Sequence, residues 1–489
     1  MTLPDPQDLR LVIVGSGFAG IGMATALLER GIDDFVVVER AADVGGTWRD
    51  NTYPGATCDV PSHLYSFSWA PNPGWTRSFS SQAEIWEYLR DVARRRGVYG
   101  KCVFGAELLE ARWEADTSRW RVRTSTGEYA ARFLVLASGA LCEPAIPEVP
   151  GLADFAGPVF HSARWDHDVD LTGKRVAAVG TGASAIQFVP EIASVARHVD
   201  VYQRTPPWVL PRSDRAIGHR ERWVYRHVPG AQRVARESIY WGRELLVFGF
   251  AKHPALNAVP QRIAWRHLRR QVPDPALRAR LTPSFRLGCK RVLISNDWYP
   301  TLQRANVNLV SAALAQVEPD AVRTADGAQY PADVIIFGTG FHVTDPPIAD
   351  KVLDSGGVSL AKHWDAGAAA LRGCTVRGFP NLFLIIGPNT GTGHTSMIVM
   401  IEAHVTYIVD ALARIERDAL VAVQPRVDAQ DRYNDELQHK LAPSVWNSGG
   451  CRSWYLNKHG RNTTLWPDFT FRFRRAVRRF DLNEYEVVA

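Results

Sequence analysis

Hydrophobic and polar positions alternate along this chain in a pattern that is typical of buried strands followed by helices. The strands are predicted from short, mostly apolar runs at residues 11–14, 35–38, 133–137, 176–179, 199–202, 307–310, 334–337 and 381–387. From about residue 395, apolar residues recur three and four positions apart as far as Ile415, which predicts a long helix with one buried face. The alternation of the two patterns predicts an α/β fold with doubly wound sheets.

Two of the predicted strands run into glycine-rich turns that open a helix. The first turn consists of Gly15, Ser16, Gly17, Phe18, Ala19 and Gly20. The second consists of Gly180, Thr181, Gly182, Ala183, Ser184 and Ala185. In this context the backbone amides of the turn and of the helix start can hold a pyrophosphate. Both turns are therefore predicted to bind dinucleotides, and the fold class becomes α/β with two Rossmann-like domains.

A single residue further along the chain from each turn predicts which dinucleotide binds there. Glu39 stands 22 residues after Gly17 and ends a predicted strand, and Arg204 stands 22 residues after Gly182 in the same position. A carboxylate accepts hydrogen bonds from a free ribose 2′-OH, whereas a guanidinium suits a 2′-phosphate. The first site is predicted to bind FAD and the second NADPH, so that electrons pass from one to the other.

The α/β alternation is interrupted twice, and these interruptions predict the domain limits. A proline-punctuated linker follows residue 141, and an Arg-, Trp- and Tyr-rich stretch from about residue 214 to 288 has a helical pattern. The prediction is an FAD-binding domain at 1–141 and 343–489, an NADP-binding domain at 142–212 and 289–342, and a helical insertion at 213–288.

Composition narrows the classes of function and partner. The 489 residues carry a net charge of +6, but no nucleic-acid recognition motif accompanies the arginines, so a basic face that attracts an anionic cofactor is the favoured interpretation. The six cysteines form no C-x-x-C pair, which predicts reduced thiols in a cytoplasmic protein and excludes a dithiol reductase.

No apolar stretch has the length of a membrane span, and no metal-site spacing is present. Residues 469–474 alternate aromatic and polar positions, which predicts a half-buried strand, with contact to a membrane surface as the alternative.

Two longer motifs stand out beside the glycine turns. Residues 155–166 fit the pattern F-x-G-x-x-x-H-x-x-x-W-[P/D], and residues 45–59 fit G-G-x-W-x(4)-[F/Y]-P-G-x(3)-D. Both motifs resemble signatures of a known family, the type I Baeyer–Villiger monooxygenases among the class B flavin monooxygenases. The resemblance covers most of the chain. It implies an NADPH- and O2-dependent enzyme that converts a ketone to an ester or lactone through a C4a-peroxyflavin.

The resemblance also implies roles for matching residues. Arg291 would stabilise the flavin peroxide anion and the Criegee intermediate, with Asp59 orienting its guanidinium; a fixed cation suits both oxyanions. Lys290, Arg204 and Thr205 would hold the NADPH 2′-phosphate, and Trp454 would belong to a mobile loop over the nicotinamide. The flavin side is completed by Arg40, Gly46, Thr47 and Trp48. His161 is expected to serve domain motion rather than catalysis.

Other interpretations stay open at this point. His342 replaces the Asp that many relatives carry after Gly340-Phe341, which puts a local flavin or substrate contact in doubt. Arg291 could be an ordinary phosphate-binding arginine, Asp59 a turn residue and Trp454 a core aromatic. At the level of the reaction, the alternatives are an N- or S-oxygenating flavin monooxygenase and a cofactor-binding flavoprotein that transfers electrons to a protein partner.

Overall fold

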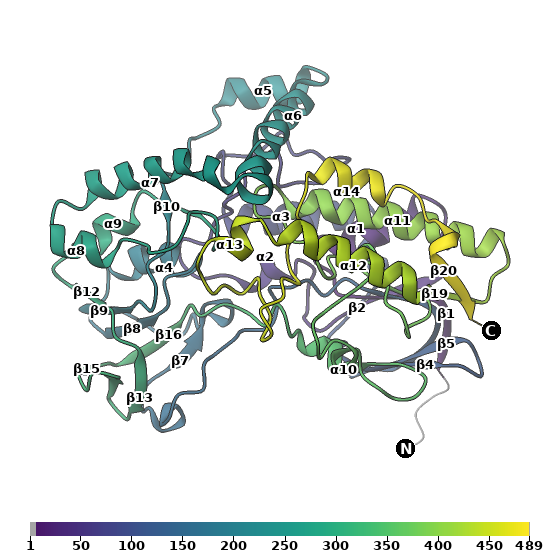
Figure 1. Ribbon diagram of the computed structural model, residues 1–489, viewed down its shortest axis with the longest axis horizontal. Coiled ribbons are helices and arrows are strands. Elements are labelled where there is room, and N and C mark those ends of the chain that lie inside the picture. The colour runs from purple at the N-terminus through teal and green to yellow at the C-terminus, as the bar shows by residue number, and fades with distance from the viewer. Residues whose placement is uncertain (1–5, 489) are drawn as a thin grey trace.

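The computed structural model describes residues 6–488, and Figure 1 shows their two main sheets side by side. The larger sheet has the strand order β17-β4-β5-β6-β1-β2-β3, with β18 also paired to β6. Its strands are β1 (Gln7–Val14), β2 (Phe35–Glu39), β3 (Cys102–Phe104), β4 (Leu108–Glu114), β5 (Arg119–Thr124), β6 (Glu128–Leu136), β17 (Val352–Leu353) and β18 (Leu382–Leu384). Strands β6, β1, β2, β3 and β18 run parallel, so their carboxyl ends meet at one edge.

Three helices cover one face of the larger sheet, two through an apolar side that they turn inward and one, α1, because it is apolar nearly all round. These helices are α1 (Phe18–Leu28), α3 (Gln82–Arg95) and α11 (Met397–Arg417). Their buried side chains share one core with those of β1, β2 and β6. The helix predicted from about residue 395 corresponds to α11, which is capped by Ser396 and keeps Ile398, Ile401, Ile408 and Ile415 buried.

The smaller main sheet is entirely parallel and has the order β12-β9-β8-β16-β7. Its strands are β7 (Val159–His161), β8 (Arg175–Val179), β9 (His198–Tyr202), β12 (Val307–Val310) and β16 (Val334–Phe337). Helices α4 (Ala185–Ile192) and α9 (Trp298–Thr301) contribute buried side chains to its core. The fold class predicted from the sequence, two dinucleotide-binding folds of this kind with a helical insertion, is confirmed.

The stretch between the two halves of the smaller sheet is helical, and Figure 1 shows part of it rising above the rest of the molecule. It contains α5 (His219–His227), α6 (Ala231–Glu244), the π-helical turn η4 (Phe248–Lys252), the 3₁₀ turn η5 (Pro254–Asn257), α7 (Ala258–Gln271) and α8 (Pro275–Arg280). A short parallel pair, β10 (Val209–Leu210) with β11 (Leu293–Ile294), lies where the chain leaves and re-enters. The domain limits given above stay a prediction.

The remaining elements are short connections and a C-terminal layer. Besides short 3₁₀ turns, they comprise α2 (Thr47–Asp50), α10 (Leu360–His363), α12 (Val427–Leu441), α13 (Val445–Ser448), α14 (Thr470–Ala476), β13 (Leu314–Glu318), β14 (Ala321–Thr324), β15 (Gln329–Pro331), β19 (Ala422–Pro425) and β20 (Tyr485–Val488). Within residues 6–488, no helix combines the length and the apolar character that crossing a bilayer requires.

The structure corrects the interpretation of residues 469–474, which are not a half-buried strand. Residues from Thr470 onward form α14, and the buried side chains are Thr470 and Phe473, which are three positions apart. In a strand, Phe471 and Phe473 would lie on one face and Thr470 on the other. Phe471 is instead exposed, while Thr470 and Phe473 are buried. A helical turn places the third residue, rather than the second, on the same side.

Candidate active site

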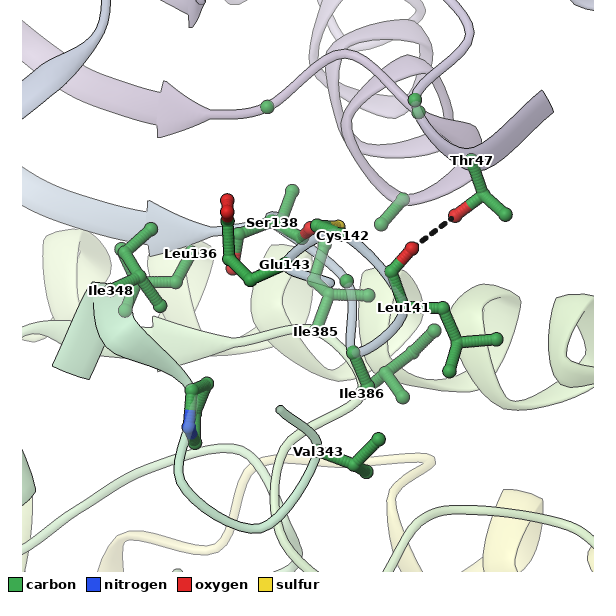
Figure 2. Close-up of a pocket in the computed structure, with 18 of the residues that line it drawn as sticks. Thr47, Leu136, Ser138, Leu141, Cys142, Glu143, Val343, Ile348, Ile385 and Ile386 are labelled. Carbon is green, nitrogen blue, oxygen red and sulfur yellow. Dashed lines mark hydrogen bonds between the residues drawn. The ribbon is translucent and has the colours of Figure 1, made fainter. Parts of the chain in front are cut away.

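A cavity of about 490 Å³ lies at the edge where the parallel strands of the larger sheet end. Its walls are built from residues that directly follow β1, β2, β6 and β18. Figure 2 shows its apolar side chains, among them Leu136, Ile348 and Ile385, and the hydrogen bond from Thr47 Oγ1 to the Leu141 carbonyl at 3.4 Å. In open α/β sheets this edge is where ligands bind.

The first glycine-rich turn forms one wall of the cavity, and its shape requires glycine. Gly15 has a φ of +99°, and a Cβ there would lie 2.8 Å from the Ala137 carbonyl oxygen. A Cβ at Gly20 would lie only 1.9 Å from the Gly15 carbonyl oxygen. Gly15, Gly17, Phe18 and Ala19 line the cavity, whereas Gly20 does not and serves the tight packing of α1 on the turn. Because these glycines carry no side chain, a phosphate-bearing ligand in the cavity can approach the backbone of the turn.

Glu39 is held firmly at the end of β2, where it lines the same cavity. Its Oε2 accepts hydrogen bonds from the Ser16 amide at 2.9 Å and from Ser16 Oγ at 2.7 Å. Its Oε1 accepts from the Ala41 amide at 3.0 Å and lies 3.1 Å from an Arg49 guanidinium nitrogen. This network fixes the carboxylate next to the glycine turn, where the sequence prediction needs an acceptor for a ribose hydroxyl.

The other residues predicted for the flavin side gather around the same cavity. Arg40, Gly46, Thr47 and Trp48 all line it. Arg40 is ion-paired with Glu143, and Trp48 donates from Nε1 to Tyr65 Oη at 3.0 Å. Gly46 approaches the first turn so closely that a Cβ would lie 3.2 Å from the Cα of Gly17.

Arg291 and Asp59 form a forked ion pair at the cavity although they lie 232 positions apart in the sequence. Arg291 Nε donates to Asp59 Oδ2 at 3.0 Å, and Nη2 donates to Oδ1 at 2.8 Å and to Oδ2 at 2.6 Å. Arg291 lines the cavity with 39% of its side chain exposed, whereas Asp59 lies behind it. The carboxylate raises the pKa of Arg291 further above its already high value, so this guanidinium stays charged.

A second arginine reaches Asp59 from the helical insertion. Arg243 of α6 donates to the backbone carbonyls of His394 at 3.1 Å and Asp59 at 3.3 Å. Burial alone would raise the pKa of Asp59, but the charges of Arg291 and Arg243 outweigh it and hold that pKa below its usual range. Asp59 is therefore a carboxylate at neutral pH. Nothing in the sequence patterns singled out Arg243, because its role depends on how α6 packs against a distant loop.

The second glycine turn follows β8 and lies outside this cavity. A Cβ at Gly180, whose φ is +117°, would lie 2.5 Å from the Gly338 carbonyl oxygen, so the turn packs tightly on the end of β16. Ser184 is the N-cap of α4 and Ala185 is buried in the core. Thr181 Oγ1 donates to the Thr205 carbonyl at 3.4 Å, which ties the turn to the end of β9.

Two cations meet near this turn. Burial, and to a smaller extent the charge of Arg204, lower the pKa of Lys290. Repulsion between like charges is relieved when an anion binds close to both of them. Gly182, Thr205 and the exposed Arg204 lie at the carboxyl ends of the parallel strands β8 and β9, as the sequence interpretation requires.

The structure corrects the prediction that all cysteines are reduced. Cys289 and Cys451 form a disulfide with Cα atoms 6.1 Å apart, while Cys58, Cys102, Cys142 and Cys374 are free. The sequence separation of 162 hid the pair from any argument based on spacing. The bond joins the segment that carries Lys290 and Arg291 to the segment that carries Trp454.

Trp454 and Tyr455 complete the cavity on the disulfide side. Both line it, and their ring centroids are 4.5 Å apart. Trp454 is 43% exposed, so it is not a core aromatic, whereas Tyr455 is buried and its pKa is raised to about 12. Sequence reasoning missed Tyr455, whose neighbour Trp454 was the available signal.

His161 lies on β7 and does not line the cavity. Its Nδ1 accepts a hydrogen bond from the Ala163 amide at 3.1 Å, and burial lowers the pKa of the ring to about 4. The ring is neutral at physiological pH. His342, the departure from the family pattern, lines the cavity and pairs with Asp345 at 3.1 Å.

Comparison with known proteins decides the family. The Flavin-binding monooxygenase-like family model matches residues 8–221. The chain is 49% identical over 484 residues to a Baeyer-Villiger monooxygenase of Streptomyces coelicolor, covering 99% of this chain and 93% of that protein. It is 45% identical over 491 residues to a Baeyer-Villiger monooxygenase of Pseudomonas aeruginosa, again covering 99% and 93%. This chain belongs to the Baeyer–Villiger monooxygenases.

Solved structures agree with this assignment. Cyclohexanone monooxygenase from Rhodococcus sp. Phi1 bound to NADP+ has a TM-score of 0.88 and 26% identity, covering 99% of this chain and 100% of that one. A steroid monooxygenase bound to NADP has a TM-score of 0.84 and 30% identity, covering 99% and 100%. The predicted family, enzyme class and cofactor pair of FAD and NADPH are confirmed. The roles of individual site residues stay predictions.

Proposed function

We propose that this chain uses NADPH and O2 to insert one oxygen atom beside the carbonyl carbon of a ketone, giving an ester or lactone. The observation that carries the proposal is Arg291, which is fixed by Asp59 and exposed to the same cavity as the first glycine turn. The pair holds the guanidinium in one orientation while part of the arginine side chain stays exposed to that cavity.

The residues of the cavity fit FAD by their own chemistry. The glycine turn leaves backbone amides accessible where a Cβ would block the approach, and Glu39 presents a fixed carboxylate beside it. Apolar side chains such as Leu136 and Ile385 suit the flat ring system of a flavin. When bound and reduced by NADPH, FAD supplies the electrons that activate dioxygen.

Arg291 contributes a permanent positive charge where oxygen-centred negative charge develops. Because its pKa is raised, it stabilises an oxyanion without giving up its proton. Asp59 holds the planar fork in one orientation, and Arg243 holds the backbone of Asp59. We assign the placement of the NADPH 2′-phosphate to Arg204, Lys290 and Thr205, and the cover of the nicotinamide to Trp454.

Oxygenation of nitrogen or sulfur is the second candidate reaction. It requires an electrophilic oxidant that is stabilised by protonation, and a fixed cation beside the oxidant favours the opposite, deprotonated form. The Arg291–Asp59 pair therefore supports attack on a ketone.

The predicted cytoplasmic location was argued in part from reduced cysteines, and the Cys289–Cys451 bond removes that support.

Arg291→Ala tests the proposal at the residue on which it depends. The variant should keep FAD and still be reduced by NADPH, but ester formation should fall by roughly 10²–10³-fold and hydrogen peroxide should replace the ester. Arg291→Lys should rescue poorly, because an ammonium on a flexible stem cannot match the fork that Asp59 accepts. Arg304→Ala, at an exposed position of the same region, is the matched control. Ester formation at a normal rate in Arg291→Ala would contradict the proposal.

A further inference from the structure

The helical insertion carries an unusual share of the exposed apolar side chains. Of the 21 large hydrophobic residues that are exposed in the described part of the chain, 11 lie within residues 223–263. Four of them follow one face of α6 and its continuation into η4, namely Val234, Trp241, Leu245 and Phe248. Their spacings of seven, four and three residues align them along a single stripe.

This stripe continues onto the C-terminal segment. The ring of Trp241 lies 5.8 Å from the ring of Phe471, and the ring of Phe248 lies 5.2 Å from that of Phe469. We call Val234, Trp241, Leu245, Phe248 and Phe471 the apolar ridge. Trp241 and Leu245 are 52% and 64% exposed, so these side chains are surface residues rather than the outer edge of a hydrophobic core.

The helices beside the ridge present further apolar side chains to solvent. They are Trp223, Val224 and Val228 near α5, and Leu256, Val259 and Ile263 on η5 and α7. Figure 1 places α5, α6, α7 and α14 along the upper edge of the molecule, with α5 and α6 projecting beyond it. The region is thus a projecting edge rather than a groove that would enclose a peptide.

Net positive charge is concentrated in the same region. Residues 213–288 contain 15 arginines and lysines but five acidic residues, a net charge of +10 against +6 for the whole chain. Exposed arginines in this region are Arg226, Arg233, Arg262, Arg266, Arg269 and Arg270. None of these six takes part in an ion pair with any residue between 6 and 488.

Charge and shape together select one occupant. A second copy of the chain docked symmetrically through this face would bring two such basic regions against each other, which opposes self-association. Nucleic acid would satisfy the arginines, but it would leave the aliphatic side chains Val234 and Leu245 exposed. An anionic bilayer surface satisfies both features, because arginines bind lipid phosphates while Trp, Phe and Leu enter the interface.

We propose that the helical insertion and α14 dock this protein on the surface of anionic phospholipid membranes through the apolar ridge and the arginines beside it. The opposite face of α6 carries Arg243, which reaches the Asp59 backbone, so the docked helix also supports the candidate active site. The proposal does not depend on the reaction that the enzyme performs.

Co-sedimentation of the FAD-loaded protein with vesicles tests it. The protein should bind vesicles of phosphatidylcholine mixed with phosphatidylglycerol, bind pure phosphatidylcholine far more weakly, and be released by high salt. The ridge variant Trp241→Ser/Leu245→Ser/Phe471→Ser should bind the mixed vesicles roughly ten-fold or more weakly, because it loses its interfacial side chains. Arg226→Gln/Arg233→Gln/Arg262→Gln/Arg266→Gln should lose roughly as much.

One control variant and three readouts keep the result interpretable. Val195→Ser/Val358→Ser/Val421→Ser removes equally exposed apolar residues outside the insertion and should bind like the original protein. All variants should keep FAD content, thermal melting and turnover of a water-soluble ketone. No vesicle binding, binding that is insensitive to the ridge variant, or a dimer in vesicle-free solution that the ridge variant dissociates would each overturn the proposal.

Discussion

Replacing Asp59 separates the orientation of Arg291 from its charge. Asp59 accepts hydrogen bonds from Arg291 Nε at 3.0 Å and Nη2 at 2.8 Å, and each charge-assisted bond contributes about 1.5–3 kcal/mol. The two side chains are 39% and 25% exposed, which places the contributions near the lower end because solvent screens the pair. Asp59→Asn keeps the size and one acceptor but loses the charge, so the two bonds together lose about 1.5–3 kcal/mol, or roughly ten- to hundred-fold in rate.

The assay compares ester formed with NADPH consumed in the same sample. In Asp59→Asn the ester rate should fall as stated and the ratio of ester to NADPH should fall with it, while FAD binding is unchanged. Because Arg291 and Arg243 hold the pKa of Asp59 below its usual range, the carboxylate is fully ionised above about pH 5. The loss should therefore be the same at pH 6 and at pH 9. A full ester yield in Asp59→Asn, or a loss that vanishes on mild acidification, would refute the reasoning.

Three further predictions follow from the structure. Arg204→Ala should raise the KM for NADPH roughly ten- to hundred-fold and leave the KM for NADH unchanged, measured by initial rates; equal use of both nucleotides by the original protein would sink the assignment. Cys451→Ser should lower the free energy of unfolding by about 2–5 kcal/mol in oxidising buffer, and a dithiol should reproduce this in the original protein but not change the variant. Because burial lowers the pKa of His161 to about 4, the unfolded state takes up the proton first, so stability should decline as pH falls from about 6.5 to about 4. Melting curves of His161→Gln should show a weaker decline over that range, and an unchanged decline would contradict the assigned neutral ring.

Local patterns were sufficient for the features that depend on neighbouring residues. The apolar runs that precede Gly15 and Gly180 predicted strands, and both turns have the tight geometry that makes glycine necessary. The position of Glu39 at the end of a buried strand was also predictable, because a strand–turn–helix–strand unit has a nearly fixed length. Its contacts with Ser16 and Arg49 were not, since they depend on side-chain orientation.

Features built from distant segments were beyond sequence reasoning. The Arg291–Asp59 pair came from family resemblance, and the support of Arg243 required the packing of α6. The Cys289–Cys451 bond joins residues that no spacing rule connects, and it overturned the expectation of free thiols. The C-terminal aromatic alternation predicted a strand, but Thr470 and Phe473 are both buried, and their spacing of three residues suits a helix.

The fate of oxygen from 18O-labelled dioxygen tests the proposed oxygen insertion most directly. The FAD-loaded enzyme is incubated with NADPH, labelled dioxygen and a panel of cyclic and linear ketones, and the masses of the products are measured by mass spectrometry. We expect at least one ketone to yield an ester or lactone with a single labelled oxygen in the new C–O–C linkage. Ketones that all emerge unchanged, with the label only in hydrogen peroxide or in an oxidised amine or sulfide, would contradict it.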